Sequence, residues 1–167
     1  MENSPILKVK KLFPDSLVPR RSFETDSGLD LTLYRVEKEY NRNNNLVYEN
    51  KLHSSDQYLI PSKSRVLANT GISATVGKGY EIQIRPRSGL ALKNGLTVLN
   101  TPGTVDESYR GPICVILYNS SESDVLIKKE DRIAQMVVCP VTLSDCEIVE
   151  DLDTTDRGEG GFGHTGR

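Results

Sequence analysis

The stretch Tyr80-Glu81-Ile82-Gln83-Ile84-Arg85 decides the fold class of this chain. Apolar and polar side chains alternate along it with a period of two residues, which is the pattern of a half-buried β-strand. Further along, Ile113-Cys114-Val115-Ile116-Leu117 is a continuous apolar run, rich in β-branched residues and too short for a typical helix. It predicts a second strand, covered on both faces.

Similar short segments recur along the chain and predict an all-β domain. Turn residues separate them, as at Gly77-Lys78-Gly79 and Pro102-Gly103. Many short strands at this spacing are typical of a sandwich or a barrel. The one helix we expect is a turn or two near Ser88–Asn94. The other predicted strands are Ile6–Leu12, Leu29–Tyr34, Tyr58–Ile60, Ser64–Ala68, Ile72–Val76, Leu96–Leu99, Asp124–Ile127, Ile133–Val138 and Glu147–Glu150.

Length and charge exclude several classes of protein. The 167 residues suit one domain, and 21 basic against 23 acidic residues leave a net charge of −2, which argues against a protein that coats nucleic acid. Apolar runs stay below the roughly 18 residues of a membrane span, and the N-terminus lacks a secretory pattern. Three cysteines without a C-x-x-C spacing argue against a metal cluster or a disulfide framework, and favour a reducing compartment, cytoplasmic or nuclear.

We assign the predicted β domain to residues 1–151. Two polar segments differ from the rest of the chain, one within this domain and one after it. The first, Glu37–Gln57, contains the run Asn41-Arg42-Asn43-Asn44-Asn45 and predicts a long surface loop or an added hairpin.

The second polar segment is the C-terminal arm, residues 152–167. Five of the last 15 residues are Gly and only Phe162 is large and apolar, so the arm cannot bury enough surface to hold itself in place. Fully extended, it would reach roughly 50 Å, far enough to cross onto a neighbouring subunit. It predicts either a plain flexible terminus or a clamp that stacks Phe162 on a ring and brings Arg157 to an anion.

The segment Arg85-Pro86-Arg87-Ser88-Gly89 offers groups that bind anions. Arg87 has a planar fork that suits phosphate oxygens, while the hydroxyl of Ser88 and the backbone N–H of Gly89 sit where a strand passes into a helical turn. An ordinary surface turn is the alternative. Asp30 and Gln135, placed on predicted strands, need polar partners, which a site would supply.

A hairpin over Asn100–Gly111 offers different chemistry. Its exposed backbone edge can hydrogen-bond a pyrimidine, Asp106 can orient and deprotonate a water molecule, and Tyr109 presents a flat face for a sugar. A loop with a capping Asp106 and a packed Tyr109 is the alternative for this segment taken alone.

Taken together and in order, five segments resemble the five motifs of the homotrimeric deoxyuridine triphosphatases (dUTPases). The resemblance covers most of the chain from Ser27 onward, and the combination of the second, fourth and fifth motifs is highly specific. The motifs are Ser27-Gly28-Leu29-Asp30-Leu31, Pro86-Arg87-Ser88-Gly89-Leu90-Ala91, Asn100–Gly111, Asp131-Arg132-Ile133-Ala134-Gln135-Met136 and Arg157–Gly166.

The resemblance implies a jelly-roll-like β fold in a threefold homotrimer. Each of three composite sites would take the first, second and fourth motifs from one subunit, the third from another and the arm from the last. The implied reaction hydrolyses dUTP to dUMP and pyrophosphate, with Mg²⁺ bound by the triphosphate, which keeps uracil out of DNA and supplies dUMP for thymidylate synthesis. The implied partners are dUTP and two further copies of the chain, without nucleic acid or membrane.

The resemblance also assigns roles to single residues. Asp106 matches the carboxylate that activates the attacking water, and Asp30 matches a residue that reaches the metal through water, with no direct protein ligand. His164 stands where the family usually has Ser. The residues that match substrate contacts are Arg87, Ser88, Gly89, Asn100, Gly103, Val105, Tyr109, Gln135, Arg157, Phe162, Gly163, His164 and Thr165.

Two other functions remain open at this point. A deoxycytidine triphosphate deaminase shares the fold, but that family has a Glu on the strand after the third motif, where this chain has Ile113–Asn119 without an acid. A dUTP-binding regulatory module, with the polar segment 37–57 as its contact for partner proteins, is the second alternative.

Overall fold

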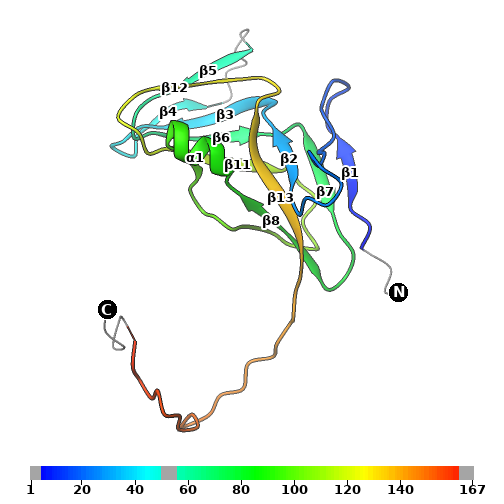
Figure 1. Ribbon diagram of the computed structural model, residues 1–167, viewed down its shortest axis with the longest axis vertical. Helices are drawn as coiled ribbons and strands as arrows, with labels where there is room; N and C mark the ends of the chain where they lie inside the picture. The colour runs from blue at the N-terminus through cyan, green and yellow to red at the C-terminus, as the bar shows by residue number, and fades with distance from the viewer. Residues whose placement is uncertain (1–4, 50–55, 162–167) are drawn as a thin grey trace.

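The computed structural model describes residues 5–49 and 56–161, and its regular structure is almost all β-strand (Figure 1). The helix α1 spans Ser88–Asn94, as predicted. Within the described ranges there is no helix long and apolar enough to span a bilayer. The strands are β1 (Lys8–Lys11), β2 (Leu29–Thr32), β3 (Arg35–Tyr40), β4 (Leu46–Glu49), β5 (Gln57–Ile60), β6 (Arg65–Asn69), β7 (Ile72–Thr75), β8 (Tyr80–Arg85), β9 (Leu96–Val98), β10 (Gly103–Val105), β11 (Cys114–Asn119), β12 (Val125–Lys128) and β13 (Arg132–Pro140).

The strands form two larger and two smaller antiparallel sheets. One large sheet has the order β10-β8-β13-β2 and the other β4-β3-β6-β11-β9, while β1 pairs with β7 and β12 with β5. Neighbours in the sheets are mostly distant in sequence. The first large sheet therefore brings β2, from near the N-terminus, beside β13, from near the C-terminus.

One hydrophobic core joins the two larger sheets. Ile82 and Ile84 of β8 are buried, and so are Val115 and Leu117 of β11; all four belong to the same cluster. Their alternation with more exposed neighbours is the pattern that predicted β8. Full burial of such a side chain stabilises the fold by about 1.5–3 kcal/mol. The all-β prediction is confirmed.

Two local predictions differ from the structure. Residues Glu147–Glu150 form no strand, because a strand needs a neighbouring ladder for its N–H and C=O groups and this segment lies against none of the described strands. The strand β11 alternates between buried and half-buried side chains, so it is covered fully on one face only.

The first described part of the polar segment 37–57, residues 37–49, folds as a hairpin, one of the two predicted forms. Its first strand, β3, already begins at Arg35 and pairs with β6, so it belongs to the large sheet. The side chain of Asn41 accepts hydrogen bonds from the backbone N–H of Asn43 and Asn45, both at 3.0 Å. Asn44 adopts a φ of 64°, a conformation that Asn tolerates better than most residues. The Asn-rich run is therefore the turn between β3 and β4.

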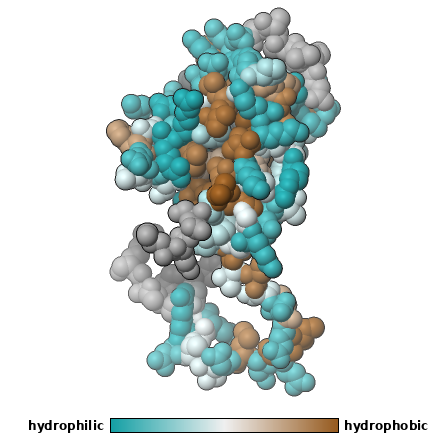
Figure 2. Space-filling view, turned by 90° about the vertical axis from the view of Figure 1, so that its right-hand side faces the viewer, coloured by the Kyte–Doolittle hydropathy of each residue, from teal (hydrophilic) through white to brown (hydrophobic). Residues whose placement is uncertain are grey.

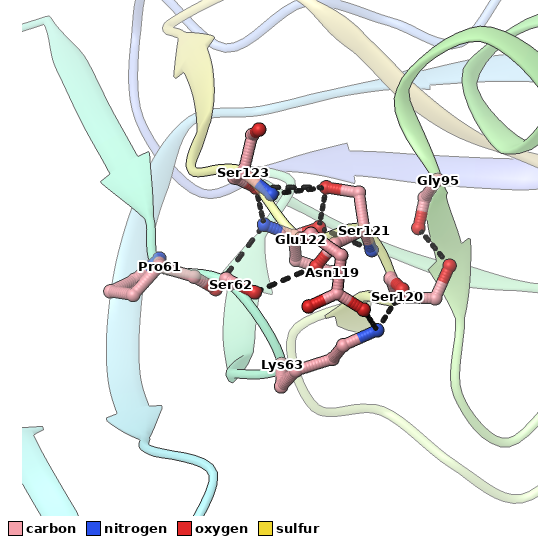
Figure 3. A network of polar contacts seen from close by, with 9 residues as sticks. All are labelled: Pro61, Ser62, Lys63, Gly95, Asn119, Ser120, Ser121, Glu122 and Ser123. Atoms are coloured by element: carbon pink, nitrogen blue, oxygen red, sulfur yellow. Dashed lines mark hydrogen bonds and ion pairs between the residues drawn. The ribbon is translucent and has the colours of Figure 1, made fainter.

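A polar network around Asn119 anchors the C-terminal end of α1 (Figure 3). Asn119 is fully buried, and its side-chain N–H groups donate to the carbonyl oxygens of Ile60, Pro61 and Ser123 at 2.8–3.2 Å. The next residue, Ser120, donates through its backbone N–H and its hydroxyl to the carbonyl of Gly95, which caps α1 with a φ of 65°. This network holds the C-terminal end of α1, while the N-terminal end of the helix faces the candidate site.

The C-terminal segment leaves the body at Pro140, the last residue of β13 (Figure 1). Residues 141–161 contain no helix or strand. Leu143, Ile148 and Leu152 are 81, 99 and 83 % exposed. Several apolar side chains so exposed in one segment are unusual on the surface of a monomer and favour contact with a second protein surface.

Candidate active site

A polar hollow of about 340 Å³ lies where β2, β8 and β13 meet the start of α1. It brings together three of the five motif segments, which are far apart in sequence. The pairing of Gln135 with both Asp30 and Arg85 places these strands side by side at this point. The hollow is lined by Ser22, Asp26, Ser27, Gly28, Asp30, Arg87, Ser88, Gly89 and Gln135.

The start of α1 supplies groups of this hollow that are chemically able to bind an anion. Arg87 is the N-cap, in an extended conformation, and its side chain does not cap the first turn. The first turn contains no acidic residue, and Ser88 and Gly89 are exposed at the hollow. Backbone N–H groups at a helix start lack partners within the helix, so they attract an anion.

The guanidinium of Arg87 is held in place by Asp30. Its Nε lies 3.0 Å from Asp30 Oδ1, and its Nη1 donates to the carbonyl of Arg132 at 2.9 Å. The other carboxylate oxygen of Asp30 contacts Nη1 of Arg132 at 3.0 Å and accepts from the hydroxyl of Ser22 at 3.3 Å. One partly buried carboxylate thus orients two cations at the hollow.

Gln135 reaches the same hollow from β13. Its Nε2 donates to the carbonyl of Pro86 at 2.9 Å, and this fixes the plane of the side-chain amide. The amide has a second N–H. Gln135 and Arg87 are therefore both oriented by partners of their own before any ligand arrives.

The predicted hairpin forms around β10, and its bond between Thr101 and Pro102 is cis. β10 pairs with the edge of β8 through Gly103, Thr104 and Val105. Asn100 lies against Gly103, since a Cβ on that glycine would be 3.1 Å from Asn100 Nδ2. The predicted site residues Asn100, Gly103 and Val105 therefore lie together on this hairpin, in a cluster separate from the hollow.

Asp106 and Tyr109 lie at the end of that hairpin. The backbone N–H of Tyr109 donates to the carbonyl of Asp106 at 3.1 Å, which closes a turn, and the Tyr109 hydroxyl donates to the carbonyl of Pro112 at 3.0 Å. Asp106 is exposed, and its carboxylate has no hydrogen bond or ion pair with any residue that the structure describes. It is free to accept a hydrogen bond from water.

The two clusters are separate in one chain. Val105 pairs with Ile82, so Asp106 lies opposite Glu81 at one end of β8, whereas Arg87 follows the other end. Six residues at about 3.3 Å each put roughly 20 Å between Asp106 and Arg87. The predicted catalytic carboxylate and the predicted phosphate-binding residues of one chain do not meet.

The described part of the arm, up to Gly161, does not line the hollow of its own chain. Arg157 is exposed, and its Nε donates to the carbonyl of Gly160 at 2.9 Å. The segment that leads to the arm leaves the body at Pro140, which pairs with Tyr80 at the end of β8 remote from Arg87. The other residues predicted to bind substrate from the arm lie outside the described part of the chain; these are Phe162, Gly163, His164 and Thr165.

The donor set at the hollow bears on the predicted Mg²⁺. Asp30 and Asp26 line it, but Asp30 is already shared between two arginines, and the described residues contain no group of three or more His, Cys, Asp or Glu side chains able to hold a metal ion. Mg²⁺ commonly keeps several waters and binds through one or two carboxylates plus phosphate oxygens. The residues present fit an ion brought with a triphosphate and touched by the protein through water.

Sequence reasoning gave no role to four residues that line the hollow, Ser22, Asp26, Ser27 and Gly28, although the last two stand in the first motif. It also gave none to Arg132, which contacts Asp30 beside the hollow. Arg132 lies in the fourth motif, next to Ile133. Its guanidinium can bind anions as that of Arg87 can, and this could have marked it as a candidate site residue from the sequence. Ser22 and Asp26 lie in a short polar loop before β2, and nothing local distinguishes them from other loop residues. They reach the site because the loop before β2 lines the hollow at Ser22 and at residues 26–28.

Comparisons with known proteins identify the family of this chain. A protein-family model described as dUTPase matches residues 50–166. The deoxyuridine 5'-triphosphate nucleotidohydrolase of Nautilia profundicola is 44% identical over 161 residues, which cover 96% of this chain and 99% of that protein. The enzyme of the same name from Ehrlichia canis is 46% identical over 164 residues, covering 96% of this chain and 95% of the other.

Solved structures share the fold at lower identity. A variant of the Staphylococcus bacteriophage 80alpha dUTPase, determined with dUpNHpp, superposes with a TM-score of 0.78 at 21% identity, covering 97% of this chain and 99% of that one. A dUTPase variant from S. aureus phage phi11, described for the coordination of a structural Mg(II) ion, has a TM-score of 0.69 at 18% identity, with 89% and 99% covered. The family match over most of the chain, the relatives and the common fold show that this chain belongs to the dUTPase family.

Proposed function

We propose that this protein hydrolyses dUTP to dUMP and pyrophosphate. The observation that carries the proposal is the convergence of Asp30, Arg87, Ser88 and Gln135 on one polar hollow beside an uncapped helix start. Such a site suits a chain of phosphates. Membership of the dUTPase family supplies the choice of nucleotide.

The hollow would bind the triphosphate. Arg87 offers a fork that matches phosphate oxygens, and Ser88, Gly89 and the second N–H of Gln135 offer further donors. Because Asp30 and the Pro86 carbonyl already orient Arg87 and Gln135, binding costs little side-chain entropy there.

Asp106 would act as the general base. It takes a proton from a water molecule whose oxygen attacks the α-phosphorus, and the bond from that phosphorus to the oxygen bridging to the β-phosphate breaks, releasing pyrophosphate. Positioning, charge neutralisation and a base for the water are the main demands of such chemistry. When bound, Mg²⁺ would neutralise charge on the triphosphate, with Asp30 holding it through water.

The hairpin would recognise the nucleoside. Asn100 and the backbone of Gly103 and Val105 would read the uracil edge, and Tyr109 would lie under the deoxyribose and leave no room for a 2′-hydroxyl. A methyl group at position 5 would meet this rigid backbone, and that clash excludes thymine more strongly than the ~1–3 kcal/mol that one methyl gains in a soft pocket.

A complete site would need more than one copy of the chain. The roughly 20 Å between Asp106 and Arg87 along β8 supports a site that takes these residues from different subunits. A hydrophobic band on the body and the apolar side chains of the arm support contacts between copies (Figure 2). We propose a homotrimer in which the arm crosses to a neighbour and closes its site with Arg157 and the residues beyond it.

Pyrophosphate release tests the reaction. The purified chain is given dUTP, dTTP, UTP or dCTP, with and without Mg²⁺, and ammonia is measured beside pyrophosphate. We expect pyrophosphate from dUTP alone, faster with Mg²⁺. Ammonia from dCTP would show a deaminase instead, and equal rates on dUTP and dTTP would contradict the proposed base recognition.

Mixing two inactive variants tests the composite site. Asp106→Asn lacks the base and Arg87→Ala lacks the phosphate clamp, so each alone should be inactive. If each site takes these residues from different subunits, random exchange in a 1:1 mixture makes about a quarter of the sites intact. Activity that stays absent after unfolding and refolding the two together would contradict the arrangement.

A further inference from the structure

Gly28 lies in the hollow, at a position where the backbone itself does not require glycine. Its φ is outside the left-handed region that favours glycine, unlike Gly71, Gly79 or Gly95. A side chain at this position is therefore compatible with the chain path. The reason for a glycine must lie in the space around it.

That space is occupied by Gln135. A Cβ built on Gly28 would overlap the Oε1 of Gln135 and lie 3.1 Å from its Cδ and 3.3 Å from its Cβ. The three nearest atoms all belong to this one side chain, and none belongs to the backbone. Gly28 thus borders the Gln135 amide and nothing else as closely.

The sheet register explains the contact. Asp30 pairs directly with Gln135, and residues 28 and 30 point to the same side of the chain because side chains alternate along a strand. Gly28 is therefore the diagonal neighbour of Gln135 on the face that holds the hollow. On the other side, the Pro86 carbonyl accepts the Nε2 hydrogen bond at 2.9 Å.

We propose that Gly28 is a positioning residue: its missing side chain makes the slot in which Gln135, fixed by the Pro86 carbonyl, directs its second N–H at a phosphate of the substrate. The slot has two walls, the backbone of Gly28 and the carbonyl of Pro86. A methyl group at residue 28 pushes the amide off Pro86 and turns its N–H away from the phosphate. This inference rests on the proposed function for the identity of the phosphate ligand.

Gly28→Ala tests the slot, with Gly77→Ala as its matched control. Gly77 also lies outside the left-handed region, and a Cβ there meets nothing within 4 Å, outside the site. We expect Gly28→Ala to lower kcat/KM for dUTP by roughly tenfold to hundredfold, as Gln135→Ala does, and Gly77→Ala to leave it unchanged. Wild-type kcat/KM in Gly28→Ala would overturn the proposal.

The double variant separates positioning from a general disturbance of the fold. If Gly28 acts only through Gln135, the Gly28→Ala change should cost nothing more in a Gln135→Ala background, and any loss of melting temperature in Gly28→Ala should be restored there. The proposal would be overturned if the fold-losses in kcat/KM of the two single variants multiplied in the double variant, or if its melting temperature stayed low.

Binding of inorganic tripolyphosphate, measured by calorimetry, keeps this test independent of turnover. We expect Gly28→Ala and Gln135→Ala to weaken binding equally. If the wild-type chain binds tripolyphosphate in this Gln135-dependent way but does not hydrolyse dUTP, the proposed function is refuted and the positioning role of Gly28 still holds. A wild-type chain that binds neither tripolyphosphate nor dUTP would overturn both.

Discussion

The polar hollow and the hairpin that carries Asp106 differ in how their polar side chains are held. In the hollow, Asp30 binds two arginines and the Pro86 carbonyl binds Gln135, so the side chains hold one another. On the hairpin, the backbone is fixed by its pairing with β8, but the Asp106 carboxylate is exposed and unpaired among the described residues. The comparison teaches that the groups proposed to bind phosphate are oriented in advance, while the proposed base is left free to accept a hydrogen bond from water.

The largest effect should come from the free carboxylate. Asp106→Asn keeps the size of the side chain and removes the base, so we expect kcat to fall by about 10²–10⁴-fold with the melting temperature unchanged. Steady-state kinetics and a thermal melt measure both. Glu107→Gln is the matched control on the same hairpin and should retain activity. Near-wild-type turnover by Asp106→Asn would refute the role of this residue.

Removal of the arm should have the next largest effect. Truncation after Asp156 takes away the exposed Arg157 and everything beyond it, so we expect roughly a hundredfold loss of kcat/KM and little change in stability. Arg157→Ala should lose less, because the glycines and Phe162 remain. Light scattering checks the oligomer. A truncated chain that unfolds would show that the arm is structural instead.

The prearranged hollow should respond more mildly to loss of its central charge. Asp30→Asn breaks the ion pairs to Arg87 and Arg132, both at 3.0 Å, and so orients these two cations less firmly, although the Arg132 carbonyl still accepts from Arg87. We expect roughly a tenfold loss of kcat/KM, shown mainly in KM. Asp145→Asn, an exposed change between β13 and the arm, is the control. A kcat loss as large as that of Asp106→Asn would contradict the division of roles.

The smallest effect concerns thiols outside both regions. Burial, helped by Glu37, raises the pKa of the Cys114 thiol to about 11, whereas Cys146 is exposed. Because the thiolate is the nucleophile, iodoacetamide at pH 8 should modify Cys146 well before Cys114, with little effect on activity. The unfolded chain releases the Cys114 proton first, so this thiol lowers the free energy of unfolding as the pH rises from about 9 to 11.

Mass spectrometry of peptides gives the alkylation rates. In guanidinium chloride, where burial is lost, the two thiols should react at similar rates. Fast labelling of Cys114 in the folded chain at pH 8 would show that its surroundings are open to solvent.

Local sequence patterns were sufficient for most of the strands and for α1. The alternation in Tyr80–Arg85 and the turn residues depend only on near neighbours, so they can be read along the chain. Glu147–Glu150 shows the limit of this reasoning. It has the composition of a strand, but a strand forms only where another edge completes its hydrogen bonds.

The sequence by itself determined the strand-rich fold class and, through its motif segments, the residues proposed for the phosphates, the base and the nucleoside. Only the tertiary structure decided which of them meet. The pairing of β13 with β2 and β8 brings Asp30, Gln135 and Arg87 to one hollow and leaves Asp106 at the opposite end of β8. The fold also adds Ser22 to the hollow and places Arg132 against Asp30. The physical reason is that strand periodicity is set by adjacent residues, whereas a site is set by sheet register between segments remote in sequence.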